Sequence, residues 1–376
     1  MASDQKHDDP RVYNFSSGPA VLPLTVLERA REEFMSLPGC GASVMEISHR
    51  SDAFNQIMES ARIRIRRLLA VPADYTVLLL QGGSRLQFSM VPMNLLQKGR
   101  TASFIVSGHW SKTAMQEAAK FGSVDACWNG QENGFKELPE TSQLCFDKDA
   151  SYVHMTSNET IQGIQYHQEP DTGDTPLVCD ASSDFLSRPI NISRYGLIFA
   201  CAQKNAGPAG VTIVILRNEL LERSQESLPG YLNYQNHASH ESCYNTPPTF
   251  AIYMLDLVCQ WLEEEMGGLA GIARVNEEKA RLLYDLLDNS EGFYRPHAIP
   301  AARSMMNVTF RLPSEQLEMD FNQQADQKGL TSLAGHRSVG GIRASIYNAM
   351  PIAGVESLCD FMKQFRDSVA EVNEHV

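Results

Sequence analysis

The sequence predicts an α/β fold, in which a sheet is covered by helices on both faces. Short apolar runs alternate with helical segments from about residue 24 to residue 216, and this alternation is typical of such a sheet. After Pro248 long helices and two strand-like stretches follow, which indicates a smaller α+β domain. We therefore expect an N-terminal segment at residues 1–15, a large domain at 16–267 and a small C-terminal domain at 268–376.

The elements of the large domain follow one another in sequence. Residues 1–12 are expected to be loosely attached, and Gly and Pro mark a loop at 14–23. Helices are expected at 24–37, from about 54 to 69, at 82–96 and at 111–121, with a turn at 108–110 before the last of these. Apolar runs predict strands at 75–80, 101–106, 152–155, 177–179, 197–202 and 211–216.

In the C-terminal part, apolar residues at helical spacing predict two consecutive helices that are separated by Gly267 and Gly268. The expected elements are helices at 249–266, 269–287, 314–328 and 354–372, with strands at 306–312 and 341–346. The chain shows no internal repeat, no low-complexity linker and no heptad array.

Composition excludes several classes of protein. The 376 residues carry a net charge of −13 at 43% hydrophobic and 20% charged content, which argues against a general nucleic-acid binder. The basic run 62–67 falls on the polar side of an amphipathic helix, where arginines need no ligand. No apolar run is long enough to span a bilayer.

Cysteine and histidine spacing points to a cytoplasmic protein without a metal site. The eight cysteines are scattered and form no C-x-x-C pair, which favours reduced thiols. The ten histidines show no metal-binding spacing. The first residues are polar and acidic, unlike a signal or transit peptide.

Lys204 and Asp180 are the most informative pair in the chain. Each follows an apolar strand, Asp180 after 177–179 and Lys204 after 197–202. This order suits pyridoxal 5'-phosphate (PLP), because a lysine amine can form a Schiff base with its aldehyde. An aspartate can keep the pyridine nitrogen protonated, so that the ring takes up electrons.

Three other segments could complete a cofactor site, although each also has an ordinary structural explanation. Gly82-Gly83-Ser84-Arg85 opens a helix and could hold a phosphate on backbone N–H groups, or be a simple glycine turn. Trp110 could stack on a flat ring or be packed in the core. Thr160 could reach the pyridine 3'-oxygen or belong to a polar turn.

Six cationic side chains lie in turns or beside glycines rather than in the predicted core. Arginine binds carboxylate and phosphate bidentately, and this many cations favours a substrate with two or three anionic groups. The six residues are His49, Arg50, Arg85, His336, Arg337 and Arg343. Surface salt bridges are the alternative for any one of them.

Taken together, these segments resemble the phosphoserine aminotransferases, class-V aminotransferases of the fold-type I PLP enzymes. The likeness runs from about Val12 to Phe365. The C-terminal motif and Asn-Thr-Pro-Pro-Thr-Phe are the most specific parts. The matching motifs are 14–20 (NFSSGPA), 48–50 (SHR), 81–85 (QGGSR), 157–163 (SNETIQG), 180–183 (DASS), 202–205 (AQKN), 244–250 (YNTPPTF) and 335–348 (GHRSVGGIRASIYN).

The resemblance implies a mostly parallel seven-stranded sheet and a role for each matching residue toward the cofactor. Lys204 would form the Schiff base and carry protons, Asp180 would pair with the ring nitrogen, and Trp110 would stack on the ring. Thr160 would bind the 3'-oxygen. The residues implied to hold the phosphate are Ser84, Arg85 and Gln203, with Asn245 and Thr246 from the neighbouring subunit.

The same resemblance implies the substrates L-glutamate and 3-phosphooxypyruvate and a homodimer with shared active sites. Arg343 would bind the α-carboxylate. The residues implied to bind the distal phosphate or carboxylate are His49, Arg50 and Arg85, with His336 and Arg337 of the other subunit. No nucleic acid and no membrane partner is expected.

One position departs from the family pattern. Ser84 stands where a third glycine is common, and serine does not readily adopt φ > 0. From the residues alone, another aminotransferase or a PLP-dependent lyase stays open, as do a catalytically silent protein of this fold and a nucleotide-phosphate-binding protein. The nucleotide-phosphate-binding alternative is weakened because the chain lacks the phosphate-loop motif G-x-x-x-x-G-K-[ST].

Overall fold

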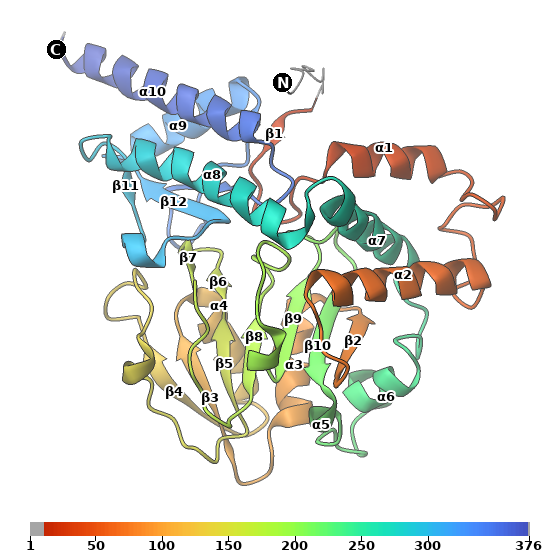
Figure 1. The fold of residues 1–376 in the computed structure, drawn as a ribbon. Coiled ribbons are helices and arrows are strands. Elements are labelled where there is room, and N and C mark those ends of the chain that lie inside the picture. Colours follow the sequence, from red (N-terminus) through yellow and green to blue (C-terminus); the bar gives the residue numbers. More distant parts are fainter. Residues whose placement is uncertain (1–10, 375–376) are drawn as a thin grey trace.

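The structure, a computed structural model, describes residues 11–374 and has a central seven-stranded sheet between two layers of helices (Figure 1). This confirms the predicted fold class. Residues 1–10 of the expected N-terminal segment lie outside the described residues. The strands of the sheet are β2 (Tyr75–Leu80), β3 (Thr101–Val106), β4 (Ser123–Asn129), β5 (Tyr152–Thr156), β8 (Leu177–Asp180), β9 (Leu197–Cys201) and β10 (Thr212–Arg217).

Their order in the sheet is β2-β10-β9-β8-β5-β3-β4. β10 runs antiparallel to both of its neighbours, and the other adjacent pairs are parallel. The sheet is therefore mostly parallel, as expected. The carboxyl ends of β5, β8 and β9 lie side by side at one edge, which is where open α/β sheets bind ligands.

The helices include those expected from the sequence and two short ones that were not expected. Ser51 and Ser314 cap α2 and α9, each accepting a hydrogen bond from the backbone N–H three residues on. Gly267, at φ 70°, separates α7 from α8. The helices are α1 (Leu24–Glu33), α2 (Asp52–Leu68), α3 (Gly83–Leu95), α4 (His109–Ala118), α5 (Asn218–Leu221), α6 (Tyr234–Ser239), α7 (Thr249–Glu264), α8 (Gly268–Asp288), α9 (Glu315–Gln327) and α10 (Ile352–Glu374).

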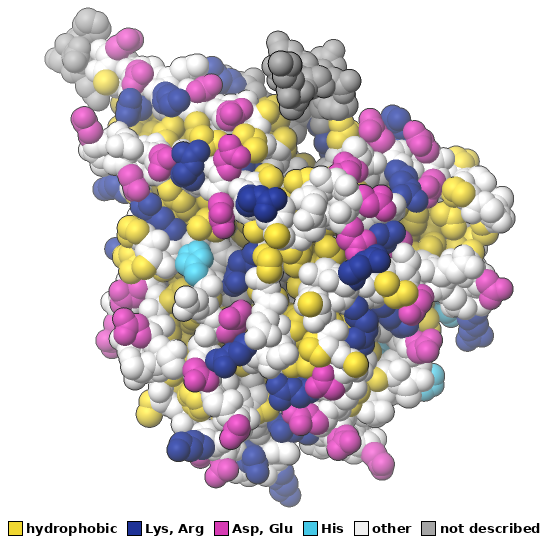
Figure 2. Space-filling model, viewed as in Figure 1, with side chains coloured by type: hydrophobic (Ala, Val, Ile, Leu, Met, Phe, Trp, Pro, Cys, Tyr) yellow, Lys and Arg dark blue, Asp and Glu magenta, His cyan; other side chains and the backbone are white. Residues whose placement is uncertain are grey.

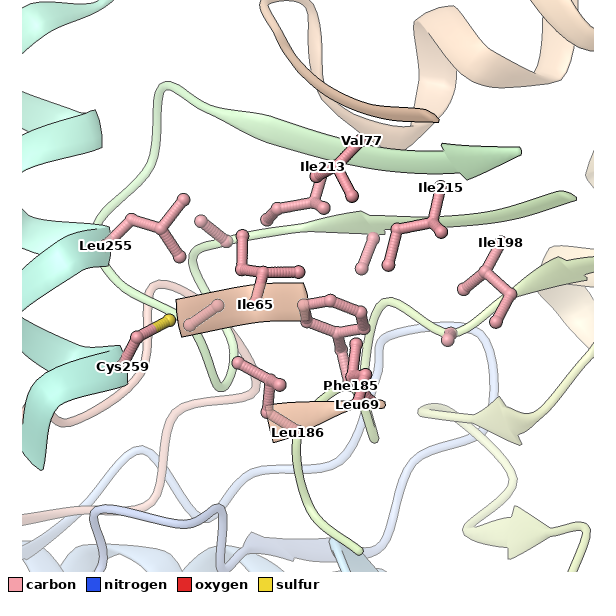
Figure 3. Close-up of a cluster of buried hydrophobic side chains, with 14 of the residues drawn as sticks. Ile65, Leu69, Val77, Phe185, Leu186, Ile198, Ile213, Ile215, Leu255 and Cys259 are labelled. Carbon is pink, nitrogen blue, oxygen red and sulfur yellow. The ribbon is translucent and has the colours of Figure 1, made fainter. Parts of the chain in front are cut away.

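Side chains along β2 alternate between two hydrophobic cores, one on each face of the sheet. Val77 and Leu79 join the cluster under α2 and α7, part of which is shown in Figure 3. Leu78 and Leu80 join the cluster that packs against α3 and α4. Burial of both faces explains why the strands are continuous apolar runs in the sequence.

Three local expectations differ from the structure. Strand β4 was not predicted, because its side chains are mostly exposed at the sheet edge and give no apolar run. α4 begins at His109, so the expected turn at 108–110 is wrong and Trp110 lies in the first helical turn. α1 ends at Glu33, four residues before the expected Leu37.

The C-terminal part has its own core, which lies between a three-stranded sheet and α8, α9 and α10 (Figure 1). Phe15 belongs to this core, and Tyr13 and Asn14 pair with Leu330 and Thr331. The N-terminal strand therefore attaches to the C-terminal part, while the domain division at Gly268 stays a prediction. The short strands are β1 (Tyr13–Asn14), β6 (Asn158–Glu159), β7 (Ile164–Gln165), β11 (Arg295–Pro296), β12 (Asn307–Arg311), β13 (Leu330–Thr331) and β14 (Ile342–Ser345).

Two arginines of α2 are paired with acidic side chains of α7. Arg64 contacts Asp256 and Glu263 at 3.1 and 2.5 Å, and Arg67 contacts Glu263 at 2.6 Å. On the face in Figure 2, basic and acidic side chains are interspersed. Between residues 11 and 374 no helix could cross a bilayer, and no cluster of three or more possible ligands could hold a metal ion.

Candidate active site

Asp180 and Lys204 meet at the carboxyl edge of the sheet. Asp180 is the last residue of β8 and pairs with Phe199 of β9, and Lys204 follows the end of β9 by three residues. Because β8 and β9 are parallel neighbours, their carboxyl ends deliver both side chains to one place. Both line a cavity of about 420 Å³, which is large enough for a cofactor with a small substrate.

The Lys204 amine faces the aromatic and hydroxyl groups of this cavity. Its Nζ donates to Thr160 Oγ1 at 2.8 Å and lies 5.9 Å from the centroid of the Trp110 ring. Thr160 stands directly after β6, in the loop that leads to β7. The structure thus brings Lys204, Thr160 and Trp110 together, while their roles toward a cofactor stay a prediction.

The Asp180 carboxyl is buried and held on one oxygen by Ser182. Asp180 Oδ1 accepts from both the backbone N–H and the hydroxyl of Ser182, and Ser84 Oγ lies 2.6 Å from Ser182 Oγ. Burial raises the pKa of Asp180, whereas the Ser182 hydrogen bonds and the positive charge of Lys204 oppose that rise. A cation close to this carboxyl would favour its ionised form.

The N-terminus of α3 forms the end of the cavity that suits a phosphate. Gly82, at φ 94°, precedes the helix and offers no side-chain cap, so the first N–H groups of α3 are available to an anion. Gly83 has φ 68°, but Ser84 is helical and absent from the positive-φ residues within 11–374. Serine therefore fits here without strain. Arg85 and Gln203 also line this cavity.

Trp110 is fixed by the buried carboxylate of Glu159. The two Glu159 oxygens accept from the backbone N–H groups of Trp110 and Ser111, each at 2.9 Å, and from Ser111 Oγ at 2.6 Å. Gln162 Oε1 accepts from the His109 N–H at 3.3 Å. Acidic and amide groups at a helix N-terminus match its positive dipole, so β6 and the following loop set the position of Trp110.

Three of the six predicted cations lie together at the cavity. Arg343 Nη2 donates to Ser17 Oγ at 2.8 Å, and Arg85 Cζ lies 5.5 Å from the Trp110 ring centroid. His336 lines the cavity, and its ring lies 5.8 Å from that of His109. Burial lowers the pKa of His336, and the nearby Arg343 lowers it further.

His336 lines the cavity that contains Lys204 of its own chain. The chain reaches this position because Gly335 N–H donates to Gly341 O, which brings residues 335–341 back beside β14. The expectation that His336 serves the site of the partner subunit stays a prediction.

The remaining predicted residues do not line this cavity. His49 is half-buried, and the others are exposed on the surface. Thr246 O accepts from Gln81 Nε2 at 2.9 Å, which places the 245–246 segment beside the residue that precedes the phosphate loop. The predicted residues that do not line the cavity are His49, Arg50, Asn245, Thr246 and Arg337.

Sequence reasoning missed several residues that shape the site. Ser17 holds Arg343, Ser182 holds Asp180, and Glu159 holds the helix of Trp110. All three fall inside motifs that were recognised, yet a serine or glutamate in a loop carries no signal of its partner. The helix-capping role of Glu159 depends on a contact across 48 or 49 residues, which local patterns do not encode.

The residues present fit PLP. The cavity combines an amine, a buried carboxyl and an uncapped helix N-terminus, and these groups match an aldehyde, a ring nitrogen and a phosphate. Thr156 lines the cavity, and its buried Oγ1 has no hydrogen-bond partner anywhere in residues 11–374. Buried polar atoms are normally paired, so a ligand with a polar group at this position fits the cavity.

Comparison with known proteins agrees with this site. Residues 12–358 match the family described as aminotransferase class-V. A phosphoserine aminotransferase of Rhodopirellula baltica is 51% identical over 357 residues, which is 94% of this chain and 95% of that protein. The phosphoserine aminotransferase structure from Bacillus circulans subsp. alkalophilus superimposes with a TM-score of 0.94 at 46% identity, and covers 96% of this chain and 99% of its own.

A PLP-bound phosphoserine aminotransferase from Trichomonas vaginalis has a TM-score of 0.89 at 40% identity, over 94% of this chain and all of that one. These matches decide against the nucleotide-phosphate-binding alternative. The chain therefore belongs to the phosphoserine aminotransferases, PLP-dependent enzymes of the class-V aminotransferase family.

Proposed function

We propose that this chain transfers the amino group between L-glutamate and 3-phosphooxypyruvate, giving 2-oxoglutarate and O-phospho-L-serine for serine biosynthesis. The observation that carries the proposal is the meeting of Lys204, Asp180 and Arg343 in one cavity. An amine, a carboxyl and a guanidinium in this arrangement suit an amino acid that reacts on a PLP ring. When bound, PLP supplies an aldehyde for the amine and a ring that takes up electrons.

The side chains that line the cavity have distinct roles toward the cofactor. Asp180 would hold a proton on the ring nitrogen of bound PLP, which would sustain the electron demand of the ring. Lys204 Nζ would anchor the cofactor, and as a free amine it would act as the general base toward the substrate α-carbon. Trp110 would stack on the ring and exclude water, while Thr160 would bind the 3'-oxygen. Ser84, Arg85 and Gln203 would hold the cofactor phosphate.

Substrate recognition follows from the charges around the cavity. Arg343 binds the α-carboxylate bidentately, and its bond to Ser17 presets its orientation. Arg85 and His336, which line the cavity, bind the distal phosphate or the glutamate side chain. His49, Arg50 and Arg337 are assigned to the same distal group. None of the three lines this cavity, which favours a role in the site of a neighbouring subunit.

A homodimer would bring the distant residues into use. Hydrophobic side chains gather at the right of Figure 2, beside α1 and the loop that follows it. Phe34, Met35 and Met45 expose 40, 80 and 60% of their surface, and exposed apolar groups of this kind mark interaction sites. The same loop carries His49 and Arg50. In the dimer, Asn245, Thr246 and Arg337 complete the active site of the partner subunit.

The enzyme is proposed to work in the cytoplasm.

The test follows the two half-reactions on purified protein loaded with PLP. Glutamate should bleach the visible absorbance of the lysine-bound cofactor and release one 2-oxoglutarate per site. Added 3-phosphooxypyruvate should then restore the band and yield O-phosphoserine. Borohydride reduction followed by mass spectrometry should locate the cofactor on Lys204, and a Lys204→Ala variant should show neither band nor turnover.

Two outcomes would contradict the proposal. A cofactor found on another lysine would remove the assignment of Lys204. A preference for pyruvate or oxaloacetate over 3-phosphooxypyruvate would show that the cations near Arg343 do not select a phosphorylated substrate.

A further inference from the structure

Lys279 of α8 is a charged residue buried in the interior, outside the cofactor cavity. Its side chain is 0% exposed, and the ammonium lies among main-chain carbonyls of the turn 346–350. Nζ donates to the oxygens of Tyr347 at 2.7 Å, Ile346 at 3.0 Å and Met350 at 3.1 Å, and Asn348 O lies at 3.5 Å. A buried cation is costly unless it is fully bonded, so packing alone does not account for a lysine here.

The turn that Lys279 binds is directly connected to the carboxylate-binding arginine. It begins immediately after β14, which carries Arg343. Tyr347, whose carbonyl accepts from Lys279, donates its hydroxyl to Ser17 O at 2.9 Å. Ser17 Oγ in turn accepts from Arg343 Nη2 at 2.8 Å. Lys279, Tyr347, Ser17 and Arg343 thus form one continuous chain of contacts.

The same turn also reaches the residue beside Lys204. The Asn348 N–H donates to Asn205 Oδ1 at 2.9 Å, and Asn348 Nδ2 donates to Leu186 O at 2.9 Å in the loop that follows Asp180. Asn276, one helical turn before Lys279, donates to Asn348 Oδ1 at 2.9 Å. α8 therefore holds the turn by both an ammonium and an amide.

We propose that Lys279 is a positioning residue: its ammonium gathers the carbonyls of the turn 346–350, and through Tyr347 and Ser17 it sets the orientation of Arg343 for the substrate carboxylate. Without the ammonium of Lys279, the four carbonyl groups of the turn would point at one another in an apolar space. They would repel one another and would have no hydrogen-bond donor. Burial lowers the pKa of Lys279 to about 7, and the carbonyls favour its protonated form. The inference rests on the proposed function, because it assigns Arg343 to the substrate.

The test replaces the cation by a side chain of similar length. Lys279→Met in the PLP-loaded enzyme should raise the KM for glutamate about tenfold or more, because small displacements of a positioning group are costly, while kcat falls less than threefold. The absorbance of the lysine-bound cofactor should persist. Arg281→Met is the matched control on the same helix, since its partner is exposed Asp285, and should leave KM unchanged.

A double-mutant cycle shows whether Lys279 acts through the arginine. Arg343→Lys alone should raise the KM for glutamate, and an unchanged KM in this variant would contradict the proposed function at Arg343. In the Arg343→Lys background, Lys279→Met should change KM less than threefold, because the orientation it protects is already lost.

Three results would overturn the inference while leaving the proposed function intact. One is a lowered melting temperature of Lys279→Met with an unchanged KM. Another is a KM effect that is equally large in the Arg343→Lys background. The third is failure of both Lys279→Met and Lys279→Gln to fold with bound PLP, which would make the lysine a requirement of the fold alone.

Discussion

The Glu159→Ala substitution should destabilise the protein by about 3 kcal/mol and loosen the Trp110 helix. Glu159 is fully buried and accepts from two backbone N–H groups and one hydroxyl. The Ser111 hydroxyl keeps a second acceptor, Gly108 O at 3.2 Å, so two donors lose their partners. Each orphaned buried donor costs roughly 1–3 kcal/mol, and removal of a buried charge offsets a part of that cost.

Thermal unfolding of the PLP-loaded protein measures this effect. A loss of about 3 kcal/mol corresponds to a fall in Tm of roughly 6–12 °C for a large domain, and Glu159→Gln, which keeps one acceptor oxygen, should lose about half as much. The control is Glu117→Ala on the same helix, whose exposed pair with Lys120 contributes little. A Glu159→Ala Tm within 1 °C of the control would refute the capping role.

Other expectations concern the chemistry, the subunits and pH. Asp180→Ala should keep the fold but lower kcat about 10³-fold or more, because the ring nitrogen loses its counter-ion. Asp180→Glu should recover part of the lost kcat. A loss of kcat under threefold for Asp180→Ala in steady-state assays would contradict this role. Mixing inactive Lys204→Ala and Arg337→Ala chains should restore part of the activity once mixed dimers form, and no recovery would show that Arg337 serves its own chain. His336 has a lowered pKa in the free protein and gains a proton beside a bound phosphate, so the KM for 3-phosphooxypyruvate should rise between about pH 6 and pH 8. His336→Gln should flatten this rise, and a slope equal to wild type would remove the histidine from phosphate binding.

The sequence predicted the features that depend on residues close together in the chain, such as buried strands. β2 and β3 occur where their apolar runs place them, and Asp180 and Lys204 meet because parallel neighbouring strands end at one edge. β4 was missed because an edge strand with exposed side chains resembles a loop. Lys279 was not singled out, since a lysine on an amphipathic helix ordinarily faces water. Only the turn that arrives about 70 residues later makes it a buried cation.

The pairing of β1 with β13 has a consequence for the order in which the enzyme is assembled. Leu330 and Thr331 are synthesised more than 300 residues after their partners Tyr13 and Asn14. At roughly 5–20 residues per second, the early segment waits about 15–60 s for its partner strand. Ser17 cannot orient Arg343 before then, so the nascent chain can complete the large sheet well before it can recognise a substrate.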